Sequence, residues 1–564
     1  MIKHVKLIAT HKELFGDIVP RKDIINLIKR APLLSSFILL SQISTDDFEE
    51  EELKQLFKEM FLDHVNIMLN HNCFQNEIGD RLRVELQTRF DRTIKNNVIF
   101  SSQSILQLWK WLLAYGDMSK INDFQEMPFS VYAILYKSLL VNDYLYSGNG
   151  EINEELFAEV FSNAVFNSNE NIFNTLCRTL LIYTEIAKDK ELYDEKEYLD
   201  INYDFMSVHG YSIKDYISVI FALMAAFLKP KKLGEQWLQD IDDMFKDTKL
   251  KDTARDIVSS LTTDFNTISK WAKAELDSTW NFIEFSKKPF LKVGGNQFLP
   301  FSMKLVYEQL FMSLFHKVRH CYDEKDKSFL TFYGKPFERY TQQIAEHATT
   351  QSKLPYKFIN EFRYGNGNSK HSPDILIRLG DKLLAIEVKS YRLTLPSISQ
   401  ANPDSIKRDK NKMIISPLKQ LHNRIKELKQ ENHWSVEGVK DIYLMAVTQG
   451  YFPTLKFYET DIRNEIEGYL SIPVKGFYHL DIEEFENLCQ VIERRRPIFR
   501  VLDNKNQEAN RYLSFGNFLH HNGYHVKHNK IFKDKFDGYI DEIGEKFFED
   551  FVYKRKVIEK RKQR

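Results

Sequence analysis

The spacing of apolar residues changes near Lys287, and this change limits the folds open to the chain. Before it, apolar residues recur every three to four positions, as in 105–113 and 173–182, which is the period of one buried helix face. After it, short strand-like runs rich in valine, isoleucine and leucine alternate with helical stretches. The pattern predicts an N-terminal all-α bundle followed by a C-terminal α/β domain with a mixed central sheet flanked by helices.

The chain has 564 residues, more than a single hydrophobic core usually serves. We therefore predict three consecutive domains: a helical domain over 1–285, an α/β domain over 286–500, and a helical extension with a basic tail over 501–564. The helical domain is expected to bind a partner protein, to mediate self-association or to regulate the α/β domain.

Two strand-like apolar runs meet at Gly380-Asp381, which predicts a two-residue hairpin turn of type II′ with glycine first. Counting back from this turn pairs Asp374 with Glu387, and the Cβ atoms of directly opposed residues lie roughly 4.5–5.5 Å apart. Side chains alternate along a strand, so Lys389 lies on the same face as Glu387. The sequence therefore predicts three charged groups at one end of an apolar hairpin.

Two opposed carboxylates repel each other, and a divalent cation removes the conflict. Mg²⁺ is held by one or two carboxylates, waters and phosphate oxygens, so Asp374 and Glu387 fit as ligands and the backbone carbonyl of Val388 could add a third. Lys389 would point at the same phosphate or at the attacking water. The alternative is a surface strand whose Glu and Lys are solvated edge residues. The buried-strand character of the flanking runs favours a metal-dependent phosphodiesterase.

Pro373-Asp374, a 12-residue spacer and Glu387-Val388-Lys389 resemble the motif of the PD-(D/E)XK nuclease superfamily, the restriction-endonuclease-like phosphodiesterases. The resemblance implies a central mixed sheet flanked by helices. It also implies hydrolysis of DNA, with RNA as the alternative substrate, and dependence on Mg²⁺, with Mn²⁺ as the alternative metal.

The resemblance covers about 330–480 and suggests further site residues. Glu338 lies in a segment similar to the first helix of many members, where an acidic residue completes the metal site; the alternative is a glutamate on a helix surface. Gln420 lies on the helix expected after the motif strand, as in members that use a glutamine there. Members with a Gln-x-x-x-Tyr pattern would carry tyrosine where this chain has Arg424. Arg424 and Lys426 could instead contact the phosphate backbone.

Charge is divided unevenly along the chain. Residues 291–564 contain 46 lysines and arginines and 35 aspartates and glutamates, a net charge of +11, and residues 1–290 carry the balancing −11. Such a division is expected when one part of a protein faces nucleic acid, although compositional drift also produces it. We expect DNA as the partner of the basic half and a protein partner or self-association for the acidic half.

The four cysteines are scattered without a CxxC pair, which argues against a zinc ribbon or a disulfide framework and fits a reducing cytoplasm. The N-terminus has no uninterrupted apolar stretch, so no secretion signal is expected. The longest apolar run, 216–228, is too short to span a bilayer. These features predict a cytoplasmic protein that does not bind membranes.

The prediction from sequence is therefore a Mg²⁺-dependent nuclease, and analogy with restriction-like systems suggests defence against foreign DNA. The alternative is a catalytically silent protein of the same fold, which binds nucleic acid or assembles complexes through its helical half.

Overall fold

The computed structural model describes ten stretches of the chain: 8–45, 50–71, 77–121, 127–145, 153–168, 171–194, 196–228, 237–494, 496–524 and 527–555. They form two compact units, each assembled from separate stretches. One unit combines 170–214 with 315–564, and the other combines the described parts of 4–169 with 215–314. This division differs from the three consecutive domains that the sequence predicted. The predicted basic tail beyond residue 555 lies outside the described residues.

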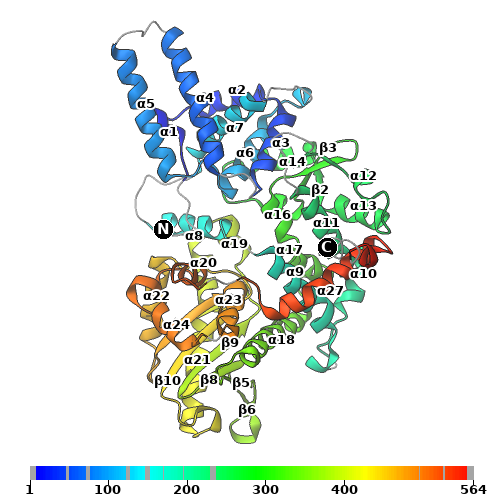
Figure 1. The fold of residues 1–564 in the computed structure, drawn as a ribbon, viewed down its shortest axis with the longest axis vertical. Helices are drawn as coiled ribbons and strands as arrows, with labels where there is room; N and C mark the ends of the chain where they lie inside the picture. The colour runs from blue at the N-terminus through cyan, green and yellow to red at the C-terminus, as the bar shows by residue number, and fades with distance from the viewer. Residues whose placement is uncertain are drawn as a thin grey trace, which may run out of the picture. The chain divides into compact units, whose positions relative to one another are not determined.

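The unit built from 4–169 and 215–314 is mainly helical (Figure 1). Its helices are α1 (His11–Phe15), α2 (Arg21–Lys29), α3 (Leu33–Ile43), α4 (Glu50–His71), α5 (Glu77–Asn96), α6 (Ser102–Tyr115), η1 (Met118–Lys120), α7 (Met127–Asn142), α8 (Glu154–Phe166), most of α11 (Ile213–Phe227), α12 (Ile241–Phe245), α13 (Lys251–Ser260), α14 (Phe265–Ala274), α15 (Ile283–Lys287) and α16 (Met303–Glu308).

Helix α6 shows how this unit is held together. Its first turn is closed by a capping box, in which the Ser101 side chain accepts from the Ser104 amide and the Ser104 side chain accepts from the Ser101 amide. The ring of Trp109 stacks on Phe37, with centroids 4.7 Å apart, and forms a T-shaped contact with Phe301, with centroids 5.0 Å apart. A well-capped helix with a buried aromatic face therefore lies in the core of this unit.

A small sheet belongs to the same unit and has the order β1-β4-β3-β2. Its strands are β1 (Gln239–Asp240), β2 (Thr262–Asp264), β3 (Phe290–Gly294) and β4 (Gln297–Pro300). Strands β3 and β4 are antiparallel and are joined by a turn at Gly295-Asn296. Because β4 and α16 pack with the helical unit, residues 286–314 belong to it rather than to the α/β domain.

The unit built from 170–214 and 315–564 contains a mixed five-stranded sheet of order β11-β10-β9-β8-β5. Strands β9, β10 and β11 are parallel, whereas β8 is antiparallel to both β9 and β5. The strands are β5 (Lys357–Asn360), β8 (Ile375–Leu379), β9 (Lys382–Lys389), β10 (Asp441–Thr448) and β11 (Gly476–Asp481), and a separate two-stranded sheet pairs β6 (Arg363–Tyr364) with β7 (Lys370–His371).

Helices surround the five-stranded sheet, and two of them contact its central strand β9. Helix α18 (Ser328–Gln351) packs on β5, β9 and α23 (Ile482–Glu493), while α21 (Ser416–Gln430) packs on β9 and β10 (Figure 1). The remaining helices are α9 (Ile172–Leu180), η2 (Leu181–Glu185), η3 (Ile186–Lys188), η4 (Lys190–Leu192), α10 (Ile201–His209), η5 (Asn366–Asn368), α19 (Leu395–Ser399), α20 (Pro403–Lys410), η6 (Asn411–Ile415), η7 (Trp434–Val436), α22 (Lys456–Glu467), α24 (Ile498–Lys505), α25 (Glu508–Arg511), α26 (Phe515–His521) and α27 (Lys530–Phe547), and α17 (Met312–Arg319) begins just before this unit.

The parallel strands of the sheet determine how the chain connects them. Parallel neighbours cannot be joined by a tight turn, so α19, α20 and α21 carry the chain from β9 to β10, and α22 carries it from β10 to β11. Strand β9 lies between two neighbours and is buried along six of its eight residues, which explains its continuous apolar sequence. The predicted helical bundle joined to a mixed α/β sheet is thus confirmed.

No single helix in the described stretches combines the length and apolarity needed to cross a bilayer. Two bent helix pairs, α2 with α3 and α10 with α11, meet that criterion on length and composition alone.

Candidate active site

The β8–β9 hairpin places the charged residues of the motif at the end opposite its turn. Gly380 has a φ of +64°, which the first position of a type II′ turn requires and which glycine adopts without strain. The register pairs Ile375 with Ile386, so Asp374, one residue before β8, comes opposite Glu387. This confirms the predicted register of the hairpin.

Asp374 is 6% exposed, and its side chain is held by the strand that it faces. Its Oδ2 accepts a hydrogen bond of 2.6 Å from the backbone N–H of Val388. Burial raises the pKa of Asp374 well above its ordinary range, and the negative charges of Glu387 and then Glu338 raise it further; Lys389 and the Val388 amide act in the opposite direction. Burial and the neighbouring carboxylates therefore favour the protonated form of Asp374, and a further cation nearby would favour the ionised form.

Glu387 is fully buried, and a cationic side chain contacts each of its oxygens. Lys389 Nζ donates to Oε1 at 2.6 Å, and Arg424 Nη1 donates to Oε2 at 2.5 Å. The same Arg424 nitrogen lies 4.0 Å from Asp374 Oδ1. The Lys389 side chain is 39% exposed and that of Arg424 is 19% exposed. Both cations can therefore be reached from solvent, while the carboxylates lie beneath them.

Glu338 lies on α18 and interacts electrostatically with the same carboxylates. Burial raises the pKa of Glu338, the negative charge of Glu361 adds to this effect, and Lys335 opposes it; Glu387 contributes a smaller rise. Gln342, one helical turn further on, donates to Glu338 Oε1 at 3.2 Å and to the backbone carbonyl of Asp374 at 3.4 Å. Glu338 is thus near enough to act on the pair electrostatically, and Gln342 links it to the hairpin.

Gln342 was missed by the sequence analysis. The signal that could have found it is its position four residues after Glu338, since residues at this spacing are neighbours on a helix surface.

The two motif carboxylates fit a hard cation. Within the described stretches, no three side chains of His, Cys, Asp or Glu converge closely enough to hold a metal ion. Mg²⁺ needs only one or two protein carboxylates when waters and phosphate oxygens complete its shell. Oxygen ligands without imidazole or thiolate suit Mg²⁺ or Mn²⁺. Asp374 and Glu387 therefore fit this ion, and the metal-binding roles of Glu338 and of the Val388 carbonyl stay predictions.

The remaining candidates lie on α21. Gln420 is half-buried one turn before Arg424, and its side chain forms no hydrogen bond to another residue of the described stretches. Lys426 is half-buried one turn after His422, and its charge is among the causes that lower the pKa of His422, after burial. Positions 420 and 424 share a helix face, whereas position 426 lies on another. The structure therefore brings Arg424 to the carboxylates, and the roles of Gln420 and Lys426 stay predictions.

Residues 333–448 match the model of the NERD family, the nuclease-related domain. The NERD match begins in α18 and ends at the last residue of β10, so it contains all eight candidate site residues. NERD is a PD-(D/E)XK-like nuclease domain, and the superfamily assignment made from the motif is confirmed. No curated protein matches the chain.

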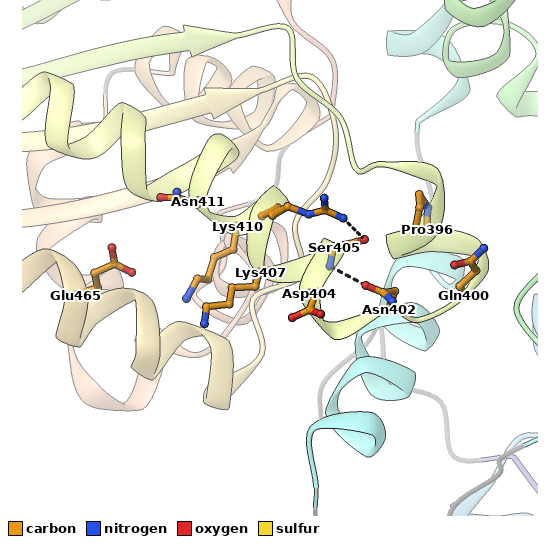
Figure 2. A pocket seen from close by; sticks show the side chains of 10 residues that line it. Pro396, Gln400, Asn402, Asp404, Ser405, Lys407, Lys410, Asn411 and Glu465 are labelled. Carbon is orange, nitrogen blue, oxygen red and sulfur yellow. Dashed lines mark hydrogen bonds between the residues drawn. The ribbon is translucent and has the colours of Figure 1, made fainter.

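A polar pocket of about 810 Å³ lies within the NERD segment and extends to α22. It is lined by the N-terminal cap of α20, Asn402, and by Lys407, Arg408 and Lys410 of that helix. Figure 2 shows the side chains of Lys407 and Lys410 extending in the same direction. Lys410 is paired with Asp461 of α22, whereas Lys407 is exposed. The crossover from β9 to β10 thus carries a basic surface in addition to Arg424.

Proposed function

We propose that residues 333–448 carry a metal-dependent nuclease site that hydrolyses phosphodiester bonds in DNA, with Mg²⁺ as its cofactor. The observation that carries this proposal is the buried pair Asp374 and Glu387 at the end of the β8–β9 hairpin, with Lys389 beside it. Two buried carboxylates in mutual repulsion destabilise a fold, and a divalent cation bound between them would relieve that repulsion.

Each residue of the site would have a distinct role. Asp374 and Glu387 would hold the cation, which supplies Lewis-acid polarisation of the phosphate and a water of lowered pKa. Lys389 is the exposed member of the set and would stabilise the negative charge that develops on the phosphate as water adds and the P–O bond breaks. Glu338 would assist as a further acidic ligand, directly or through water.

Several features support nucleic acid as the substrate. The NERD match supports a nuclease-related role, and residues 291–564 carry a net charge of +11. Arg424, Lys426 and the exposed Lys407 all lie on the crossover from β9 to β10, where they could contact phosphates. We propose DNA as the substrate and RNA as the alternative, Mn²⁺ as a substitute metal, a cytoplasmic location and a role in defence against foreign DNA. The helical half would bind a partner protein or a second copy of the chain.

A cleavage assay tests the proposal. Supercoiled plasmid, linear duplex, single-stranded DNA and RNA are incubated with the full chain, with Mg²⁺ or with chelator. We expect Mg²⁺-dependent cleavage of a DNA substrate and its loss in Glu387→Ala and Lys389→Ala. Cleavage should be retained in the matched control Lys419→Ala, since Lys419 lies on α21 and pairs with Glu465 of α22. Equal cleavage by the wild type and both site variants would refute the assignment.

A second candidate is a catalytically silent protein that uses the same domain to bind nucleic acid. The observation that favours it is the pairing of both Glu387 oxygens with cationic side chains. The assay separates the two candidates: a silent protein would bind the substrates in a gel-shift experiment yet cleave none of them with Mg²⁺ or Mn²⁺.

A further inference from the structure

We propose that the Arg424 guanidinium lies where a cation shared by Asp374 and Glu387 would bind, so that the cation binds only by displacing it from Glu387. This inference rests on the proposed function, since it concerns the same two carboxylates. It gives Arg424 a role that differs from the phosphate contact expected from its sequence position.

The geometry carries the proposal. Arg424 Nη1 lies 2.5 Å from Glu387 Oε2 and 4.0 Å from Asp374 Oδ1, and is therefore situated beside both carboxylates. Mg²⁺ binds oxygen at about 2.0–2.1 Å. A cation shared by these two oxygens would fill the space that the nitrogen occupies, so Arg424 and the metal exclude each other.

The other oxygens of the pair are already engaged. Asp374 Oδ2 accepts from the Val388 amide, and Glu387 Oε1 accepts from Lys389. The backbone amide cannot leave without disrupting the hairpin. A metal shared by Asp374 Oδ1 and Glu387 Oε2, the oxygens nearest Arg424, would therefore leave these two contacts in place and displace Arg424 alone.

Arg424 cannot give way by losing its proton, because a guanidinium stays charged at all ordinary pH values. It must move as a side chain. Its contact with Glu387 runs through a single nitrogen rather than a two-pronged fork, and its side chain is 19% exposed. Movement toward solvent therefore breaks one short hydrogen bond and does not require the helix to shift.

A second carboxylate lies within reach of the displaced side chain. Glu427 is three residues further along α21, where helix neighbours face each other. It pairs with Lys370 at 3.0 Å and accepts from Tyr364 at 2.9 Å, and its side chain is 37% exposed. Arg424 already acts electrostatically on Glu427, although Lys370 has the larger effect. The displaced guanidinium would thus keep an acidic neighbour.

The proposal has a measurable consequence for metal affinity. In the wild type, the hydrogen bond between Glu387 and Arg424 must break before the metal binds, and this lowers the affinity. Replacing Arg424 with methionine keeps much of the apolar stem and removes the competing charge, so it should tighten metal binding about tenfold, or ~1.4 kcal/mol. Arg424→Lys keeps the charge without the planar guanidinium and should fall between the two.

The experiment is a calorimetric titration of Mn²⁺ into the full-length protein in the absence of nucleic acid. The variants are Arg424→Met, Arg424→Lys and, as a matched control, Lys419→Met, which removes a positive charge from the same helix but is paired with Glu465. We expect tighter binding in Arg424→Met, an intermediate value in Arg424→Lys and no change in Lys419→Met. Thermal unfolding of each variant verifies that the fold is retained.

The outcomes separate this inference from the proposed function. Equal or weaker Mn²⁺ binding by Arg424→Met, with normal binding by the wild type, would overturn the displacement while leaving the metal site in place. Equal tightening in Lys419→Met would reduce the effect to general charge and overturn it as well. Absence of Mn²⁺ binding in both the wild type and Arg424→Met would overturn the metal site itself.

Discussion

Two glutamate–arginine pairs in the same unit differ in burial and in the geometry of their contacts. Away from the motif, Glu486 of α23 is paired with Arg178 of α9: Nε donates to Oε1 at 2.7 Å and Nη2 donates to Oε2 at 3.1 Å. The Tyr340 hydroxyl adds a hydrogen bond of 2.5 Å. Arg178 is 1% exposed and Glu486 is fully buried. At the motif, Glu387 meets Arg424 through one nitrogen of a partly exposed guanidinium.

The difference lies in how the charges are matched. Glu486 faces an arginine fork and a hydroxyl, so its oxygens are satisfied within a closed group. Glu387 faces a second carboxylate, Asp374, and both depend on cations that solvent can reach. Burial alone therefore does not mark a functional site. Two carboxylates that share partly exposed cations indicate a site that can exchange its partners, whereas a buried two-pronged arginine contact indicates a structural role.

The largest expected effect is on catalysis. Glu387→Gln should lower the rate of DNA cleavage by at least about 10²–10³-fold, because it removes charge from the site where the metal would act. Glu486→Gln should leave the rate per folded molecule near that of the wild type. Cleavage rates normalised to the folded fraction, measured by circular dichroism, check this. Similar losses in both variants would remove the distinction between the two pairs.

The free energy of unfolding should show the reverse order, with the larger loss from breaking the Arg178–Glu486 pair. Breaking the buried Arg178–Glu486 pair with Arg178→Met leaves Glu486 uncompensated and should lower the free energy of unfolding by about 3–5 kcal/mol. Arg424→Met should cost less than half as much, because solvent reaches this pair. Urea denaturation of the metal-free protein measures both. If Arg424→Met proved the more destabilising change, the motif pair would be the structural one.

The hairpin and its sheet could be predicted from sequence, because the information is local. Gly380 fixes the turn, alternation fixes which side chains share a face, and the helix expected to carry Gln420 occurs as α21. The association of 170–214 with the NERD-containing unit could not be predicted. It depends on contacts such as that between Arg178 and Glu486, which are 308 positions apart, and hydrophobic periodicity does not identify partners over such a separation.

Only part of the candidate site could be predicted from sequence. Asp374, Glu387 and Lys389 follow from the register of one hairpin. The position of Arg424 beside Glu387 depends on how α21 crosses β9, which the spacing of residues within the helix does not specify. Gln342 depends in the same way on how α18 packs against the hairpin.

The pH dependence of stability tests whether the buried carboxylate Asp374 destabilises the fold in the absence of a metal. The pKa of Asp374 is raised in the folded protein, so as pH rises above its ordinary 3.8 the unfolded chain loses this proton first and the folded state loses stability until the raised pKa is passed. Asp374→Asn lacks this loss. In metal-free buffer it should therefore be more stable than the wild type at neutral pH, with the difference disappearing in acid.

Denaturation midpoints measured across pH check this expectation. Asp381→Asn, at the half-exposed turn of the same hairpin, is the control and should show no such difference. A wild type more stable than Asp374→Asn at neutral pH would show that the carboxylate is already compensated without metal.

The smallest effects are expected at the basic surface of the crossover. Lys407→Ala and Lys426→Ala should each weaken DNA binding modestly and reduce the salt dependence of the affinity, by about 0.9 in the log–log slope for each phosphate that is no longer neutralised. Lys440→Ala is the control. Lys440 is 79% exposed and directly precedes the first residue of β10, whereas Lys389 of the site pairs with the last residue of that strand, Thr448. Fluorescence anisotropy with Ca²⁺ at several salt concentrations measures the slopes. Identical slopes in all three variants would place the nucleic acid elsewhere.

The most direct test of the central claim is anomalous diffraction from crystals of the full-length protein soaked in Mn²⁺. The account predicts an anomalous peak for a Mn²⁺ ion within bonding distance of oxygens of both Asp374 and Glu387, with the Arg424 guanidinium moved away from Glu387. A Mn²⁺ peak at other residues, with Arg424 still on Glu387, would contradict it.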